Sequence, residues 1–83
     1  MKKKVEYFRE VEEVNDTFVE ATVPSVNIRK EPGYNGAIIA TATEGQKLKH
    51  YSTIVDPDGV SWHEVGAEGN HGWICGKFSR LVE

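Results

Sequence analysis

The sequence contains little that could hold a small protein together by cross-links. It has one cysteine, Cys75, among 83 residues. A single thiol excludes an internal disulfide framework and a cysteine-rich zinc site. The fold must therefore be stabilised by side-chain packing.

Long apolar runs are also absent. Met1 is followed by three lysines, as at the start of a secretory signal, but the next residues, VEYFREVEE, are interrupted by charges. This stretch lacks the apolar segment of a signal peptide, and no stretch is apolar enough to span a membrane as a helix. We therefore expect no signal peptide, synthesis in the cytoplasm and no membrane partner.

Positive charge is scarce. Ten Lys and Arg residues stand against 13 Asp and Glu residues, which gives a net charge of −3. The basic run at residues 2–4 is followed closely by acidic residues. Because nucleic-acid binding needs a concentrated basic surface, we expect no nucleic-acid partner.

The composition that remains is typical of one small globular domain. Hydrophobic residues make up 39% of the chain and charged residues 28%. A chain of this size buries only about 60–65% of the surface that its unfolded form exposes. We therefore expect a thin core filled by a few branched and aromatic side chains.

The first 20 residues are predicted to form an N-terminal extension. Apolar residues recur at every third position: Val5, Phe8, Val11 and Val14. This spacing favours a short helix that ends at Asn15, although the β-branched residues would also suit an edge strand. The extension is interpreted as a linker or an element packed on the domain, with a self-association segment as the alternative.

From Thr17 onwards, short β-rich segments alternate with turn signals. The predicted strands are residues 18–23, 26–29, 37–42, 46–55, 60–65 and 71–75. A 3₁₀ turn is predicted at residues 76–80, and residues 81–82 are a candidate for a last strand. The sequence Asp-Pro-Asp-Gly at residues 56–59 predicts a reverse turn. Five to six short strands indicate an all-β fold, and the span is too short for a two-sheet sandwich.

Four sequence elements in this region resemble the signature of bacterial SH3 domains. They are Thr22-Val23 with Val26-Asn27-Ile28-Arg29 and Pro32, then Glu44-Gly45-Gln46-Lys47-Leu48, Trp62-His63-Glu64-Val65 and Gly72-Trp73-Ile74. They occur in the family's order and cover residues 21–82. The resemblance implies a small SH3-like barrel of five to six strands over residues 21–83. The link between Val23 and Val26 is shorter than usual, and the hairpin around residues 56–59 is longer.

The resemblance also implies a function. Bacterial SH3 domains commonly serve as non-catalytic cell-wall-binding domains of peptidoglycan hydrolases, including phage endolysins and autolysins. The expected partners are a peptidoglycan peptide stem or glycan, together with a parent catalytic domain or further copies of the chain. The chain would then act at the cell wall after lysis or export. The alternative is a protein–protein interaction module or phage accessory protein that uses the same barrel.

The cysteine and histidines offer two chemical alternatives. Cys75 could pair with His50, His63 or His71 as an activated nucleophile. His63, His71 and Cys75 also form a set that zinc accepts. However, no helix N-terminus is predicted beside Cys75 to lower the pKa of its thiol, and the ligand spacing is not that of a metal motif. We therefore predict no catalytic residue, no metal site and no cofactor.

Aromatic residues are the stronger candidates for ligand binding. If Val65 and Ile74 point into the core, strand alternation turns Trp62 and Trp73 outwards. Partly exposed aromatic rings stack on sugars and peptides, although both tryptophans could instead cover the open ends of a small barrel. The predicted ligand-binding residues are Tyr34, Asn35, Tyr51, Asp56, Asp58, Trp62, His71 and Trp73.

Overall fold

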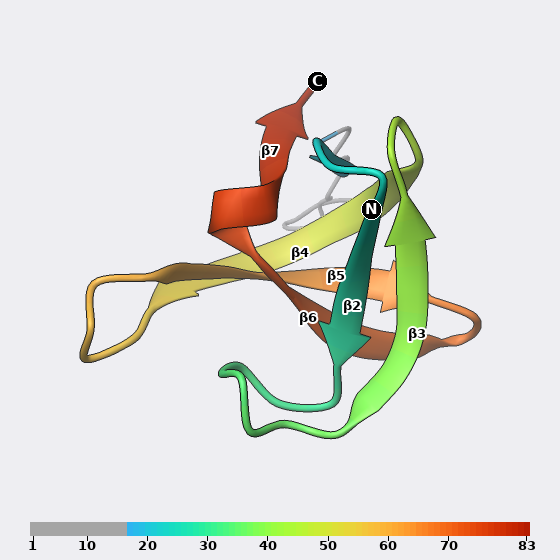
Figure 1. Ribbon diagram of the computed structural model, residues 1–83. Coiled ribbons are helices and arrows are strands. Elements are labelled where there is room, and N and C mark those ends of the chain that lie inside the picture. Colours follow the sequence, from blue (N-terminus) through green and yellow to red (C-terminus); the bar gives the residue numbers. More distant parts are fainter. Residues whose placement is uncertain (1–16) are drawn as a thin grey trace, which may run out of the picture.

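The computed structural model describes residues 17–83, which form a single antiparallel sheet of seven strands (Figure 1). The strands are β1 (Phe18–Ala21), β2 (Ser25–Arg29), β3 (Ile38–Thr43), β4 (Lys47–Val55), β5 (Ser61–Ala67), β6 (Asn70–Cys75) and β7 (Ser79–Val82). A single 3₁₀ turn, η1 (Gly76–Phe78), separates β6 from β7.

The order of the strands in the sheet is β3-β2-β6-β5-β4-β1-β7. Three neighbouring pairs, β2–β3, β4–β5 and β5–β6, are consecutive in the chain and form hairpins. The pairs β2–β6, β1–β4 and β1–β7 join strands that are distant in sequence. The hydrogen-bonded order begins at β3 and ends at β7, so the sheet has two edges.

The prediction of an all-β fold is confirmed, but the strand count of five to six is too low. Strands β1 and β7 pair with each other, and this pairing stabilises both of these four-residue segments as strands. Strand pairing also does not close the sheet into a barrel. The alternative helix and strand predictions for the first 15 residues lie outside the described part of the chain.

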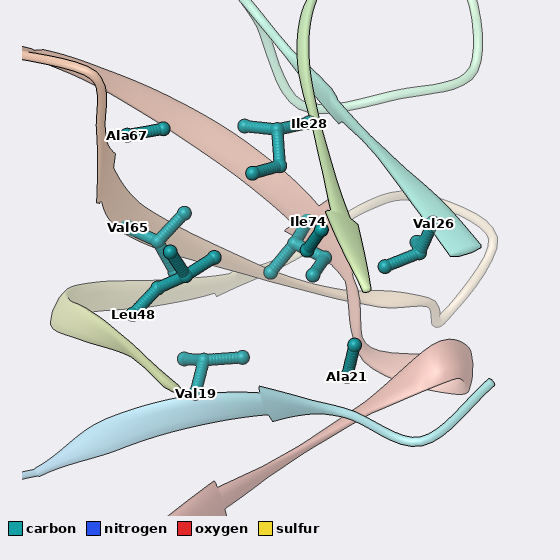
Figure 2. Packing of buried hydrophobic residues seen from close by; sticks show 9 residues of the cluster. Val19, Ala21, Val26, Ile28, Leu48, Val65, Ala67 and Ile74 are labelled. Carbon is teal, nitrogen blue, oxygen red and sulfur yellow. The ribbon is translucent and has the colours of Figure 1, made fainter. Parts of the chain in front are cut away.

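The sheet is curved, and the hydrophobic core lies on its concave side. Its buried side chains come from six strands, and Figure 2 shows them converging on one space. The cluster consists of Val19, Ala21, Val26, Ile28, Ala42, Leu48, Val65, Ala67 and Ile74. In β2, buried Val26 and Ile28 alternate with exposed Ser25 and Asn27. This confirms the half-buried strand that the sequence pattern predicts.

Gly72 is required by close packing inside this core. It pairs with Val65 across β5 and β6, so both residues face the same side of the sheet. A Cβ atom at Gly72 would lie 2.5 Å from Cγ2 of Ile28 and 2.9 Å from Cδ1 of Ile39. The missing side chain therefore lets β2 and β3 pack closely over β6.

The β4–β5 hairpin extends away from the core, to the left in Figure 1. At its tip, the amide of Gly59 donates to the carbonyl of Asp56 at 2.9 Å, and Gly59 has a φ of 82°. This positive φ is the conformation that glycine adopts without steric cost, and the predicted reverse turn is confirmed. Among residues 17–83, no helix has the length and apolar character needed to cross a membrane.

Candidate functional site

A pocket of about 260 Å³ opens between β2, the β2–β3 loop and η1. Strand β2 contributes Ser25, Val26, Asn27 and Arg29 to its lining. The remaining lining residues are Val23, Tyr34, Trp62, Cys75 and Phe78. The pocket therefore combines aromatic and aliphatic walls with a polar strip along β2.

Arg29 fixes the loop that carries Tyr34. Its Nη1 donates to the carbonyl oxygens of Tyr34 at 2.9 Å and Gly36 at 3.0 Å. The base of the loop is closed by the amide of Lys30, which donates to the carbonyl of Ala37 at 2.7 Å. Arg29, the last residue of β2, thus holds the loop in the conformation that forms one wall of the pocket.

Tyr34 lies across Trp62 and reaches Cys75. The Tyr34 and Trp62 rings meet edge to face, with centroids 5.1 Å apart. The Tyr34 hydroxyl is 3.2 Å from Sγ of Cys75. This hydrogen bond, followed by partial desolvation, raises the pKa of the Tyr34 hydroxyl above its ordinary value. Tyr34 is 53% exposed and is positioned to contact both solvent and a bound ligand.

The expectation that Trp62 is partly exposed is wrong, because only 1% of the residue is accessible. Trp62 does lie on the opposite side of β5 from Val65, as strand alternation predicts. It is nevertheless covered there, since Tyr34 packs on its ring. Trp62 therefore forms the floor of the pocket, whereas the exposed Tyr34 and Phe78 form its rim.

Asp56 holds Trp62 in this position. Its Oδ2 accepts a hydrogen bond from Nε1 of Trp62 at 3.1 Å, and its Oδ1 accepts from the amides of Asp58 and Val60 at 2.9 Å each. These donors, led by the amide of Val60, lower the pKa of Asp56. The carboxylate therefore links the hairpin turn to the pocket floor.

Three other predicted residues, Tyr51, His71 and Trp73, do not line the pocket. The rings of Tyr51 and His71 stack with centroids 4.2 Å apart. Trp73, in β6, is partly buried. Its partner in β5 is Glu64, and its partner in β2 is Arg29. These residues lie on the same side of the sheet as Trp62 but further along the strands.

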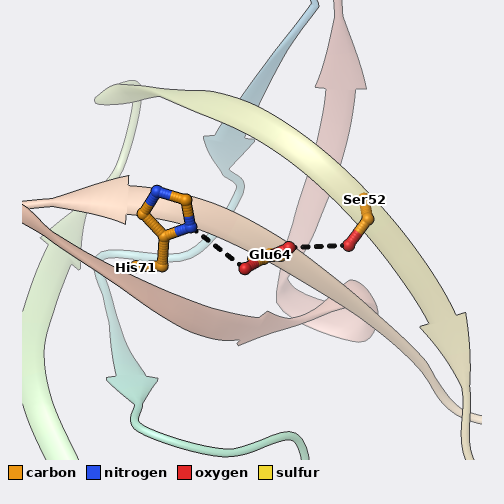
Figure 3. Close-up of polar contacts among 3 residues, drawn as sticks. All are labelled: Ser52, Glu64 and His71. Carbon is orange, nitrogen blue, oxygen red and sulfur yellow. Dashed lines mark hydrogen bonds and ion pairs between the residues drawn. The ribbon is translucent and has the colours of Figure 1, made fainter.

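Glu64 connects this second group through hydrogen bonds (Figure 3). Its Oε1 accepts from the Ser52 hydroxyl at 2.8 Å, and its Oε2 lies 3.1 Å from Nδ1 of His71. The Ser52 contact first, and then the His71 contact, lower the pKa of Glu64. Because the carboxylate lies between the hydroxyl and the imidazole, this arrangement does not place a base next to a nucleophile.

Asn35 and Asp58 are exposed in their loops and do not line the pocket. Of the eight predicted residues, the structure therefore brings Tyr34 and Trp62 together in one pocket and adds Asp56 as the support of Trp62.

The structure does not bring Cys75 together with a histidine as a nucleophile and base. Cys75 shares a face of β6 with His71, but its hydrogen-bond contact is the Tyr34 hydroxyl. His63 pairs with Ile74 and lies on the other side of the sheet. Within residues 17–83, no three His, Cys, Asp or Glu side chains are grouped closely enough to hold a metal ion.

Two residues that shape the pocket, Arg29 and Phe78, are not among the predicted ligand-binding residues. Arg29 is a motif residue on a strand beside the loop, where a polar side chain is expected to support structure rather than to contact ligand. It does support the loop, and it also lines the pocket. Phe78 lies at the end of η1 and is 38% exposed at the rim. No local pattern distinguishes it, because its place in the pocket depends on pairings between distant strands.

Comparisons of the chain with protein families, with curated proteins and with solved structures find no match.

Proposed function

We propose that this chain is a non-catalytic module that binds peptidoglycan, with the peptide portion seated in the pocket beside the β2–β3 loop. The observation that carries the proposal is the pairing of an exposed Tyr34 with a buried Trp62 at a pocket of about 260 Å³. Exposed aromatic rings around a fixed aromatic floor provide apolar contact area at low conformational cost.

The size and lining of the pocket favour a ligand of which only a small part enters the pocket, as with a short segment of a larger polymer. Its volume of about 260 Å³ lies just below the range of about 300–1,000 Å³ for sites that enclose a drug-sized ligand. One or two small residues of a peptide stem would fill it. Ser25 and Asn27 could exchange hydrogen bonds with the peptide backbone, because both are exposed on β2.

The motifs that resemble bacterial SH3 domains support the same proposal. In this proposal, the curved sheet corresponds to an SH3-like barrel, and the chain acts at the cell wall as the targeting part of a peptidoglycan hydrolase. A site this small binds weakly on its own. A parent catalytic domain or further copies would raise the overall affinity by effective concentration.

Sedimentation with purified Gram-positive cell walls tests the proposal. We expect wild-type protein to pellet with the walls, and Tyr34→Ala to lower the apparent affinity about tenfold, as for an aromatic side chain that contacts the ligand directly. Tyr51→Ala is the matched control, because Tyr51 is 44% exposed but lies outside the pocket. Absence of wild-type protein from the pellet would overturn the function. Equal losses for both variants would overturn the pocket as the site.

A second candidate, a protein–protein interaction module, is favoured by strand β3. This strand is an edge of the sheet, and Ile38 and Ile39 are exposed on it. Sheet edges can pair with a strand of a partner protein. Walls stripped of protein distinguish the two candidates: retained binding supports peptidoglycan, whereas binding only to untreated walls supports a protein partner.

A further inference from the structure

We infer that the pocket recognises the free carboxylate at the end of a short peptide and that Arg29 is the residue that binds it. This inference rests on the proposed function and narrows its ligand to a chain end rather than an internal peptide segment.

The charge of the pocket supports an anionic ligand. Of the described residues that line it, Arg29 is the only Lys, Arg, Asp or Glu. The nearby carboxylate of Asp56 is already engaged by Trp62 and two backbone amides. An acidic group in the ligand would therefore meet one cation and no carboxylate among the residues that line the pocket.

The hydrogen bonds of Arg29 leave donors for such a group. Both loop carbonyls are bonded by the same nitrogen, Nη1. Within residues 17–83, the Nε and Nη2 groups make no hydrogen bond, so the two bonds to the loop orient the guanidinium without consuming its other donors. A planar guanidinium binds a carboxylate through two parallel hydrogen bonds.

The apolar lining defines the rest of the ligand. The Arg29 guanidinium carbon lies 5.9 Å from the centroid of the Tyr34 ring, so the cation and the aromatic rim are adjacent. Val26 and Phe78 extend the apolar wall. The ligand that fits this arrangement is a peptide whose last residue has a small apolar side chain, as in peptidoglycan stems that end in alanine.

A pair of peptides that differ only at the chain end tests the inference without altering the protein. Acetyl-Lys-D-Ala-D-Ala is titrated into the full 83-residue chain as the free acid and as the carboxamide, and binding is followed by backbone amide NMR shifts. We expect the free acid to bind about tenfold more tightly or better, because the amide loses the charge-assisted hydrogen bonds. Equal affinities, or no binding of either peptide, would overturn the inference.

Two arginine variants separate ligand binding from loop support. In Arg29→Gln, we expect the ratio of the two affinities to fall to about one. The affinity for the amide should also fall, because the loop that carries Tyr34 loses two hydrogen bonds. Arg80→Gln is the matched control, since Arg80 pairs with Glu20 and does not line the pocket. If Arg29→Gln weakens both peptides equally and keeps their ratio, Arg29 only supports the loop and the inference fails.

The two proposals can fail separately. If walls sediment the chain but the two peptides bind equally, the wall-binding function stands and the carboxylate inference is overturned. If the free acid is preferred but walls do not sediment the chain, the carboxylate inference stands and the wall-binding function is overturned.

Discussion

At the scale of single residues, the pocket depends on a carboxylate that does not line it. Asp56 is placed by the reverse turn at the tip of the β4–β5 hairpin and fixes the indole of Trp62. The buried indole N–H would lose its hydrogen-bond partner without this carboxylate, and an unpaired buried donor is destabilising.

We expect Asp56→Ala to lower the thermal unfolding temperature by several degrees, because it removes the acceptor of three N–H groups. Circular dichroism melting curves measure this change. Asp58→Ala, in the same turn, is the control, since the side chain of Asp58 is exposed and Asp56 bonds only its backbone amide. Similar melting temperatures for the two variants would contradict the role of Asp56.

Only two of the residues that line the pocket, Tyr34 and Trp62, are predicted from the sequence as ligand-binding residues. An aromatic residue in a Pro-Gly loop is typical of a binding surface, which predicts Tyr34, and strand alternation correctly predicts Trp62 on the face opposite Val65. Alternation could not predict that Tyr34 covers Trp62, because this contact joins a loop to a strand 28 positions further on. The same limit applies to Tyr51 and His71, which are predicted ligand-binding residues but stack on each other outside the pocket.

At the scale of secondary-structure elements, strands and turns follow local patterns, whereas pairings do not. The alternation in β2 and the glycine of the β4–β5 turn predicted their structures correctly. The pairing of β2 with β6, which brings Arg29 opposite Trp73, joins residues 44 positions apart. No sequence periodicity carries that information, and the pocket depends on it.

Gly72 provides a test of this packing between elements. We expect Gly72→Ala to lower the free energy of unfolding by about 1–3 kcal/mol, the usual cost of overpacking a core. The added methyl would contact Ile28 at 2.5 Å and lies 3.2 Å from the carbonyl oxygen of Arg29. Urea unfolding measures the change.

Gly66→Ala is the control for this substitution, because Gly66 is in the neighbouring strand β5 and its added methyl would meet the Tyr51 ring at an ordinary 3.4 Å. We expect a change below about 1 kcal/mol for this variant. A larger loss for Gly66→Ala than for Gly72→Ala would contradict the described packing of β2 over β6.

At the scale of the whole molecule, stability is expected to increase from acidic to neutral pH. His63 is 7% exposed, and its Nδ1 lies 2.7 Å from the Thr53 hydroxyl. Burial, and then the charge of His50, lower the pKa of His63. The folded chain therefore resists protonation of His63 at a pH where the unfolded chain accepts a proton.

This difference fixes the sign of the pH dependence. The contribution of neutral His63 is fully present above the unfolded pKa of about 6.5 and is lost as the pH falls from there through the lower folded pKa. The lowered pKa values of Asp56 and Glu64 give a further loss below about pH 4.5. Urea unfolding at pH 7, 6, 5 and 4 measures both steps. His63→Gln should remove the loss between pH 7 and 5, and an unchanged slope would contradict this assignment.

The pairing of β1 with β7 has a consequence for how the molecule folds. It places Phe18 opposite Val82, and Arg80 reaches Glu20 at 3.0 Å across a sequence separation of 60 residues. Closing a loop of this length costs about 2 kcal/mol more conformational entropy than closing a four-residue hairpin. The hairpins β2–β3 and β4–β5 can therefore form early. The β1–β7 pair becomes favourable only after the strands that lie between β1 and β7 in the sequence have assembled into the sheet. Strand β7, which has one neighbour in the sheet, is therefore expected to open more readily than the central strands β5 and β6.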